Sequence, residues 1–314
     1  MNFSRIAKCI DVDRMQRSKV SLIGAGGAAG LGKNVVRCGL GSLDLFDFDV
    51  ISEENLSRQA HAAVAMGKPK TEALADEVHR INPAVAVRCF NRDVTTMSDD
   101  EVRDTFGNTD LVVVATDNFQ AQAFGNKIAL MLKKPAVWIG LYENGAAGEV
   151  VFWDRDIIPC YRCLLEKRYA AQEKAAAEGK SLDPASDGCT IFDISHLDAI
   201  AGDVCVGLLT RGADNRLGRL IDQLNGRNFI QVQFDPSWTL NGRNPVRERL
   251  GVAVDNPAFF AWNAMAMSDP DKGEKYCPDC EEYRGHEYCP LLGGGWKSTP
   301  RWETDPKATT ARPS

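Results

Sequence analysis

The chain has 314 residues, 44% of them hydrophobic and 25% charged, so it is long enough for one large α/β domain or a domain with an appendage. Its net charge of −6 and its interspersed acidic and basic residues argue against a nucleic acid or a membrane surface as the main partner. Residues 1–19 contain no apolar run of the kind found in secretion signals, and no stretch approaches the roughly 20 apolar residues of a spanning helix. We therefore expect a cytoplasmic protein whose ten cysteines are thiols, metal ligands or nucleophiles.

The first half of the chain alternates short apolar strands with helices. Residues 20–23 form a strand that runs into a glycine loop and a helix, and residues 43–47 form a second strand that ends in acid. The elements predicted next are a helix over 70–81, a strand over 85–87, a buried strand over 111–115, a helix over 118–133 and a strand over 135–139. This order predicts an α/β fold with a doubly wound, mostly parallel Rossmann-like sheet that binds ligands at the carboxyl ends of its strands.

The second half is less regular. The elements expected there are a strand over 148–153, an exposed helix over 165–179, an apolar helix over 196–210, and strands over 229–234 and 259–267. Residues 293–314 are rich in Gly, Pro and Thr, which is typical of a disordered tail.

A glycine loop and an acid suggest a nucleotide. Gly24, Gly26 and Gly27 stand at the turn from strand to helix, where backbone N–H groups and the helix N-terminus can meet a phosphate. Asp47, at the end of the second strand, is suited to bind a ribose hydroxyl. A tight structural turn is the alternative for the loop, and neither feature separates NAD from ATP.

The segments 47–59, DFDVISEENLSRQ, and 67–70, GKPK, favour ATP. They bring Arg58 and Lys70 beside the phosphate loop, where fixed cations hold a triphosphate and take up developing charge. A dehydrogenase has no need of this pair. Either cation alone could merely solvate a helix face.

These segments resemble the ThiF/MoeB family and the adenylation domains of ubiquitin-activating enzymes. The family pattern is D-x-D-x-V-x-x-x-N-L-x-R-Q followed by G-x-P-K, and the chain matches it with isoleucine in the place of valine. The resemblance implies that Asp47 holds the ATP ribose and that Asn55, Arg58 and Lys70 contact the phosphates. Lys68 is a neighbouring alternative, but the family's lysine follows the proline.

Thr116-Asp117-Asn118 closes the strand over 111–115. A carboxylate at a strand's C-terminal end suits Mg²⁺, which takes one or two protein carboxylates plus phosphate oxygens. Asp117 or Asn118 could instead cap the next helix. The family carries a similar segment whose Asp holds the metal, so the resemblance implies Asp117 as the magnesium ligand and Asn118 as its neighbour in the nucleotide site.

Two C-x-x-C pairs, Cys160 with Cys163 and Cys277 with Cys280, suit Zn²⁺ bound by four thiolates. A redox role is the competing interpretation, although neither pair opens a thioredoxin-like unit. Both pairs resemble the family's, the first within P-C-Y-R-C-L. We expect a structural zinc site, for which the neighbouring His286 or Cys289 could replace one ligand.

Cys189 and Arg5 are the last candidates. A cysteine in a similar loop forms a thioester, persulfide or acyl-disulfide in some family members, and thiolates take over acyl groups readily. A buried core cysteine is the alternative, the role that we assign to Cys38, Cys89 and Cys205. Arg5 is similar to an N-terminal arginine that enters the partner's ATP site in some relatives.

The resemblance implies an adenylyltransferase that activates the C-terminal carboxylate of a ubiquitin-like or sulfur-carrier protein ending in Gly-Gly. ATP, Mg²⁺ and Zn²⁺ are the implied cofactors, and a homodimer is the implied assembly. We expect residues 1–164 to form the nucleotide-binding half and residues 165–292 to complete the same domain. The alternatives are activation of a small-molecule, tRNA-borne or peptide carboxylate, a NAD-dependent oxidoreductase, and a catalytically inactive scaffold.

Overall fold

The fold is described from a computed structural model of the chain. The described residues are 1–157, 159–180, 182, 188–235, 237–239, 242–244, 247–248, 251, 263–266 and 277–284. His286, Cys289 and the tail predicted over 293–314 lie outside this set.

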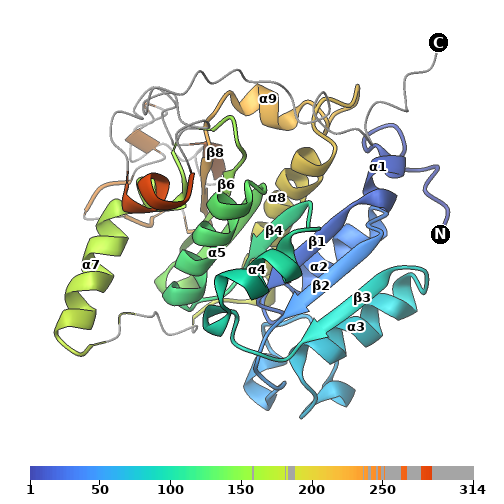
Figure 1. Ribbon diagram of the computed structural model, residues 1–314, viewed down its shortest axis with the longest axis horizontal. Coiled ribbons are helices and arrows are strands. Elements are labelled where there is room, and N and C mark those ends of the chain that lie inside the picture. The colour runs from blue at the N-terminus through green and yellow to red at the C-terminus, as the bar shows by residue number, and fades with distance from the viewer. Residues whose placement is uncertain are drawn as a thin grey trace.

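One sheet organises the described part of the chain, with eight strands in the order β3-β2-β1-β4-β5-β6-β7-β8 (Figure 1). The strands are β1 Lys19–Ile23, β2 Ser42–Phe46, β3 Ala86–Phe90, β4 Leu111–Val114, β5 Ala136–Leu141, β6 Ala147–Trp153, β7 Phe229–Gln233 and β8 Asn263–Ala266. The first five run parallel, as the alternation of strands and helices predicts. The last three run antiparallel to their neighbours, a direction that their apolar patterns leave open.

Helices cover both faces of the sheet, which confirms the doubly wound α/β class (Figure 1). On one face, α2 Ala29–Arg37 and α3 Lys70–Ile81 pack together, and α8 Ile191–Leu209 packs on α2 and on β5 and β6. On the other face, α5 Phe119–Leu132 packs on β4 beside α4 Asp99–Phe106 and α6 Tyr161–Leu164. The remaining helices are α1 Val12–Arg17, α7 Glu166–Ala177 and α9 Leu220–Leu224, with short turns η1 Glu53–Asn55, η2 Ala63–Ala65, η3 Val94–Thr96, η4 Glu143–Gly145 and η7 Cys280–Arg284.

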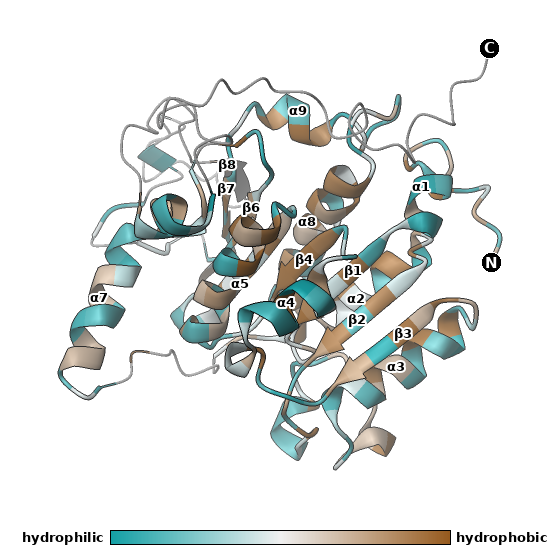
Figure 2. Cartoon of the chain, viewed as in Figure 1, coloured by the Kyte–Doolittle hydropathy of each residue, from teal (hydrophilic) through white to brown (hydrophobic). Residues whose placement is uncertain are grey.

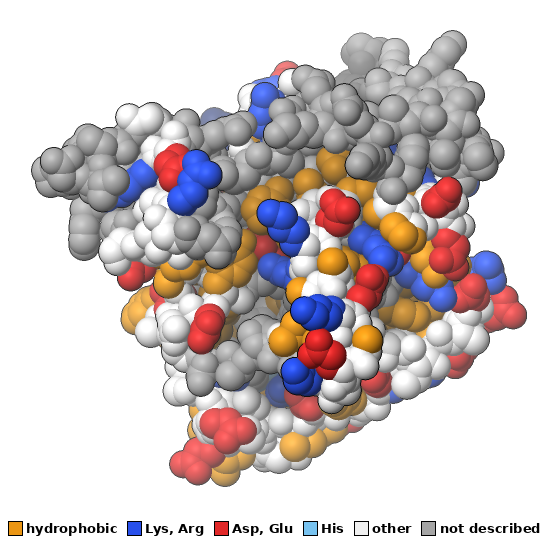
Figure 3. All heavy atoms as spheres, turned by 90° about the vertical axis from the view of Figure 1, so that its left-hand side faces the viewer, with side chains coloured by type: hydrophobic (Ala, Val, Ile, Leu, Met, Phe, Trp, Pro, Cys, Tyr) orange, Lys and Arg blue, Asp and Glu red, His pale blue; other side chains and the backbone are white. Residues whose placement is uncertain are grey.

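Burial follows from this layering. Every residue of β4 and of β6 is buried, because both strands are covered on both faces. The apolar strands stand out against the polar surface of α4 (Figure 2). The face that carries α7 shows side chains of both charges intermixed (Figure 3). The Glu and Lys residues of the α7 sequence predict such a mixed surface. No helix among the described residues is long and apolar enough to cross a membrane.

Two expectations need correction. Helix α8 begins at Ile191 rather than at 196, because the Thr190 side chain accepts the N–H groups of Phe192 and Asp193 while Asp193 bonds back to the Thr190 N–H. Cys89 is exposed rather than part of the core, because it lies on β3, the edge strand of the sheet. Cys205 is buried, as expected.

Candidate active site

A cavity of about 750 Å³ opens at the carboxyl ends of the parallel strands. It lies where the chain connections diverge between β1 and β4, the place at which doubly wound folds bind ligands. The sequence-predicted residues that line it are Gly24, Gly26, Gly27, Asp47, Asn55, Arg58, Lys70, Asp117, Asn118 and Cys189. Arg5 does not line it; this residue is exposed in the turns before α1.

The glycine loop passes close to the end of β4. Gly24 has a φ of +95°, and a Cβ there would lie 2.4 Å from the carbonyl oxygen of Ala115, so only glycine fits. A Cβ on Gly26 would contact the Gln59 amide at 2.9 Å. At Gly27 a Cβ would meet nothing within 4 Å. The loop is thus packed on one side and open at Gly27, where a ligand can approach the backbone.

Asp47 ties the loop to the end of β2. Its Oδ2 accepts the N–H of Ala25 at 2.8 Å, and its Oδ1 accepts the N–H of Asp49 at 2.9 Å. Burial raises the pKa of Asp47, while the two N–H donors and Lys70 oppose that shift. A carboxylate offers about four lone-pair sites, so these two bonds leave room for a ribose hydroxyl.

Three cations line the end of the cavity next to β2 and β3, where a nucleotide is predicted to bind. The Nζ of Lys70, a nearly buried residue, lies 2.7 Å from Asp49 Oδ2, whereas Lys68 pairs with Asp76 on the surface and does not line the cavity. The guanidinium of Arg58 makes no ion pair within the described residues. Arg92, which follows β3, is a third lining cation that the motifs did not indicate.

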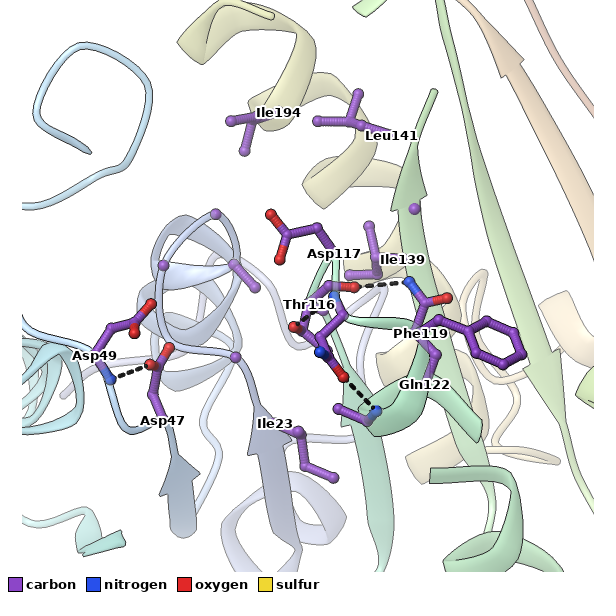
Figure 4. A pocket seen from close by; sticks show the side chains of 18 of the residues that line it. Ile23, Asp47, Asp49, Thr116, Asp117, Phe119, Gln122, Ile139, Leu141 and Ile194 are labelled. Atoms are coloured by element: carbon purple, nitrogen blue, oxygen red, sulfur yellow. Dashed lines mark hydrogen bonds between the residues drawn. The ribbon is translucent and has the colours of Figure 1, made fainter. Parts of the chain in front are cut away.

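The two neighbouring residues after β4, Asp117 and Asn118, have different roles. The Oδ1 of Asn118 accepts the N–H of Ala121 at 2.8 Å, so Asn118 caps α5. The Asp117 side chain instead points into the cavity, toward the side on which Asp47 lies and below Ile194 in the view of Figure 4. Of the two, the capping role therefore falls to Asn118, and Asp117 remains the metal candidate.

A buried carboxylate accepts one N–H group in the first turn of α2. Asp198, which is 5% exposed on α8, accepts the N–H of Leu31 at 3.0 Å, and Ala28 has no side chain that could cap this helix. Burial raises the pKa of Asp198 to about 7. A dinucleotide places its pyrophosphate at this helix end. One N–H of this helix end is thus taken by Asp198; the phosphate role predicted for the glycine loop and this helix end stays a prediction, as does the choice between ATP and NAD.

Cys189 sits at the rim of the cavity against the turn between β5 and β6. Gly188 and Gly145 both have positive φ, and a Cβ on Gly145 would lie 2.9 Å from the Cys189 Cα. The thiol is only partly buried. Two tightly packed turns therefore fix the backbone of this cysteine next to the cavity.

The two C-x-x-C pairs meet although 117 residues separate them, and their four sulfurs lie within 4.8 Å of one another. Cys160 Sγ lies 3.4 Å from Cys277 Sγ, and Cys163 Sγ lies 3.7 Å from Cys280 Sγ. Four sulfurs about 2.3 Å from a tetrahedral Zn²⁺ would be about 3.8 Å apart. This geometry is compatible with zinc.

Polar groups surround the cysteine cluster in the way that metal-bound thiolates require. Asn126 directs its Nδ2 at Cys160 Sγ (3.6 Å) and donates to Asp279 (2.7 Å), which Arg162 also contacts at 2.7 Å. Hydrogen bonds from the other three thiols hold the pKa of Cys163 far below its usual range. Burial instead raises the pKa of Cys160, so the shift toward the thiolate is confined to Cys163 and does not extend to the cluster as a whole.

Several lining residues besides Arg92 escaped the sequence motifs, Arg168 and Asp198 among them. Arg168 and Asp198 come from α7 and α8, far along the chain from the glycine loop. The only signal for them was their place on predicted helices in the second half. Arg92, by contrast, follows a predicted strand end and could have been found there.

The fold and the site define a doubly wound α/β nucleotide-binding protein with a four-cysteine cluster. Comparison with known families gives the assignment: the chain belongs to the ThiF family, whose model matches residues 2–209. This confirms the resemblance that the motifs indicated.

Several curated proteins are similar to the chain. It is 29% identical to the probable adenylyltransferase/sulfurtransferase MoeZ of Mycobacterium tuberculosis over 71% of this chain and 56% of that protein. It is 34% identical to the molybdopterin-synthase adenylyltransferase of Escherichia coli K12 over 48% and 60%, respectively. It is 27% identical to ubiquitin-like modifier-activating enzyme 5 of Caenorhabditis elegans, and that match covers 52% of this chain and 41% of the relative. The chain thus spans about half the length of these relatives.

Solved structures support the fold. The crystal structure of E. coli MccB with ATP superposes with a TM-score of 0.52 at 19% identity, and the match covers 63% of this chain and 57% of the MccB chain. That of PaaA has a TM-score of 0.56 at 17% identity, with 71% of each chain covered.

Proposed function

We propose that this chain uses ATP and Mg²⁺ to adenylate the C-terminal carboxylate of a ubiquitin-like or sulfur-carrier protein that ends in Gly-Gly. The names of its relatives, which include adenylyltransferases and a ubiquitin-like modifier-activating enzyme, support this activity. The observation that carries the proposal is the convergence of the glycine loop, Arg58, Lys70 and Asp117 on one cavity.

In the proposed reaction a carboxylate oxygen attacks the α-phosphorus of ATP, and the bond from that phosphorus to the β-bridging oxygen breaks. The products are an acyl-adenylate and pyrophosphate, and no proton or electron is transferred. Mg²⁺, when bound, neutralises charge on the phosphate oxygens. Asp117 holds that ion and Asp47 the ribose, while Asn55, Arg58 and Lys70 bind the phosphates, so that positioning and electrostatics lower the barrier.

Further steps belong to the same proposal. The Cys189 thiolate attacks the acyl carbonyl carbon, the bond to AMP breaks, and a thioester forms; its position on the cavity lining supports this step. The assembly is a cytoplasmic homodimer, in which Arg5 reaches the site of the other subunit. Residues 165–292 complete the domain begun by 1–164, with Cys160, Cys163, Cys277 and Cys280 holding a structural zinc.

Exchange of labelled pyrophosphate into ATP tests the proposal. We expect exchange that depends on a carrier protein ending in Gly-Gly and that falls about 100-fold in Asp117→Ala. Exchange with a small carboxylate, a tRNA or a free peptide, but with no such carrier, would favour the alternative substrates. Calorimetry adds a second check: ATP with Mg²⁺ should bind, and NAD should not. No exchange with any carboxylate, together with wild-type nucleotide binding by Asp117→Ala, would refute the proposal.

A further inference from the structure

A buried acid fixes an arginine at the β5 end of the cavity. Glu149 of β6 is 1% exposed and lies opposite Gly140 of β5. Its Oε1 accepts a hydrogen bond from Arg168 Nη1 at 2.7 Å, and its Oε2 accepts one from Arg168 Nη2 at 3.1 Å. The Tyr142 hydroxyl donates to the same Oε2 at 2.7 Å. The planar guanidinium of Arg168 is therefore oriented before any substrate enters.

The same guanidinium retains binding capacity. Arg168 borders the cavity, and 33% of its side chain is accessible. Besides Glu149, its Nη1 contacts the Tyr161 hydroxyl at 3.3 Å. Among the residues that the structure describes, its Nε–H and its second Nη2–H donate to no protein group. Arginine has five N–H donors, so two remain for a ligand.

Arg168 stands apart from the other lining cations. The strand order puts Arg92 after β3 and Arg58 and Lys70 after β2, at the nucleotide end of the cavity edge. Arg168 pairs with β6 at the opposite end. Asp117, after β4, lies between these groups, with Asp47 on one side of it and Leu141 on the other (Figure 4).

Hydrogen bonds also join Arg168 to the segment that carries Asp117. The Tyr161 hydroxyl donates to Gln122 Oε1 at 2.9 Å, and Gln122 Nε2 donates to the carbonyl oxygen of Thr116 at 2.7 Å. Tyr161 also stacks on Trp138, with ring centroids 4.7 Å apart, and this packing holds the Tyr161 hydroxyl in place. A continuous chain of hydrogen bonds thus joins Arg168 to Thr116, the residue before the metal candidate Asp117.

We propose that Arg168 binds the carboxylate of the acyl substrate and directs it at the α-phosphate. This role rests on the adenylation proposed above, in which two anions must approach each other and repel. One carboxylate oxygen forms the new bond to phosphorus as the bond to pyrophosphate breaks. The other becomes the carbonyl oxygen of the acyl-adenylate and stays beside Arg168, so the arginine contacts both substrate and product.

Two defined ligands test this role without knowledge of the natural carrier. One is 5′-O-sulfamoyladenosine, and the other is the same molecule carrying a glycyl-glycyl group on the sulfamoyl nitrogen, which mimics an acyl-adenylate. Calorimetry on the full chain gives the ratio of their affinities, which we call the acyl increment. We expect an increment of at least tenfold in the wild type. Arg168→Gln should abolish it and leave sulfamoyladenosine and ATP binding within about twofold.

Matched variants separate substrate binding from an anchoring role. Lys167→Met removes a neighbouring exposed cation of α7 and should keep the full increment. Glu149→Gln keeps the Arg168 cation, so its acyl increment should fall at most threefold. If Arg168 merely anchored α7, the acyl increment would fall equally in Glu149→Gln and Arg168→Gln. The double variant Glu149→Gln/Arg168→Gln leaves no buried unpaired acid, so it reports on Arg168 even where the single variant misfolds.

The outcomes are distinguishable. An increment that persists in a folded Arg168→Gln or double variant overturns the role of Arg168 and leaves the proposed function intact. A wild type that binds ATP and sulfamoyladenosine but shows no increment also overturns the role of Arg168, whereas the proposed function is overturned only when carrier-dependent pyrophosphate exchange is absent as well.

Discussion

At the scale of single residues, Asp198 gives the protein a pH-dependent stability. Its pKa is about 7 in the folded protein and near 3.8 in the unfolded chain. Between these values the folded state binds the proton and the unfolded state does not, so the free energy of unfolding falls as pH rises, by about 4 kcal/mol in all.

Asp198→Asn should remove this dependence. The amide keeps an oxygen for the Leu31 N–H but carries no charge, so the variant should be more stable than the wild type above pH 7, and the difference should shrink toward pH 4. Urea denaturation at pH 5, 6, 7 and 8 measures the effect. Parallel stability curves for the two proteins would show that the buried carboxylate is not the cause.

Lys70 and Lys68 form a natural matched pair, because only Lys70 lines the cavity. Lys70→Met should lower carrier-dependent pyrophosphate exchange about 100-fold, since a fixed cation is lost from the phosphates. Lys68→Met should stay within about twofold, because its partner Asp76 is on the surface. Equal losses in the two variants would argue against a phosphate contact at residue 70.

The residues of the site differ in how far the sequence could predict them. Asp47, Lys70 and Asp117 each lie near the end of a predicted strand or the start of a predicted helix, so topology alone brings them together. Arg168 and Asp198 reach the cavity from helices whose position depends on packing between distant segments. No local pattern in one sequence carries that information.

At the scale of elements, the start of α8 shows how local chemistry can outweigh apolar periodicity. The apolar pattern predicts a start at 196, whereas the capping box at Thr190 and Asp193 starts the helix at 191. That signature was readable in the sequence. The antiparallel direction of β6 to β8 was not, because direction depends on the connections between strands rather than on their composition.

Thr190→Ala tests this cap. We expect a loss of about 1 kcal/mol in unfolding free energy and a fraying first turn. Because Cys189 immediately precedes the cap, its alkylation rate, followed by peptide mass mapping, should rise in the same variant. Thr190→Ser keeps the hydroxyl and serves as the control. An unchanged rate at Cys189 would mean that its two glycine turns hold it independently of the helix.

At the scale of the whole molecule, the cysteine cluster joins the C-terminal segment to the α5 face of the sheet. Cys277→Ser should abolish a zinc content of about one per chain, because three thiolates and a serine bind Zn²⁺ far more weakly. Its melting temperature should fall as well. Elemental analysis and thermal unfolding measure both effects. Cys89→Ser removes an exposed cysteine outside the cluster and should change neither; a zinc-free wild type would contradict the assignment.

Gly140 lies against the acid that orients Arg168. A Cβ at Gly140 would lie 3.2 Å from the Cγ of Glu149, so even alanine there requires the acid to shift by a few tenths of an ångström, and a larger side chain presses on the acid and, through it, on Arg168. Positions 140, 149 and 168 are therefore coupled by direct contact. We expect relatives to change all three together, and a coordinated change of this kind would mark a lineage that has turned to a different acyl partner.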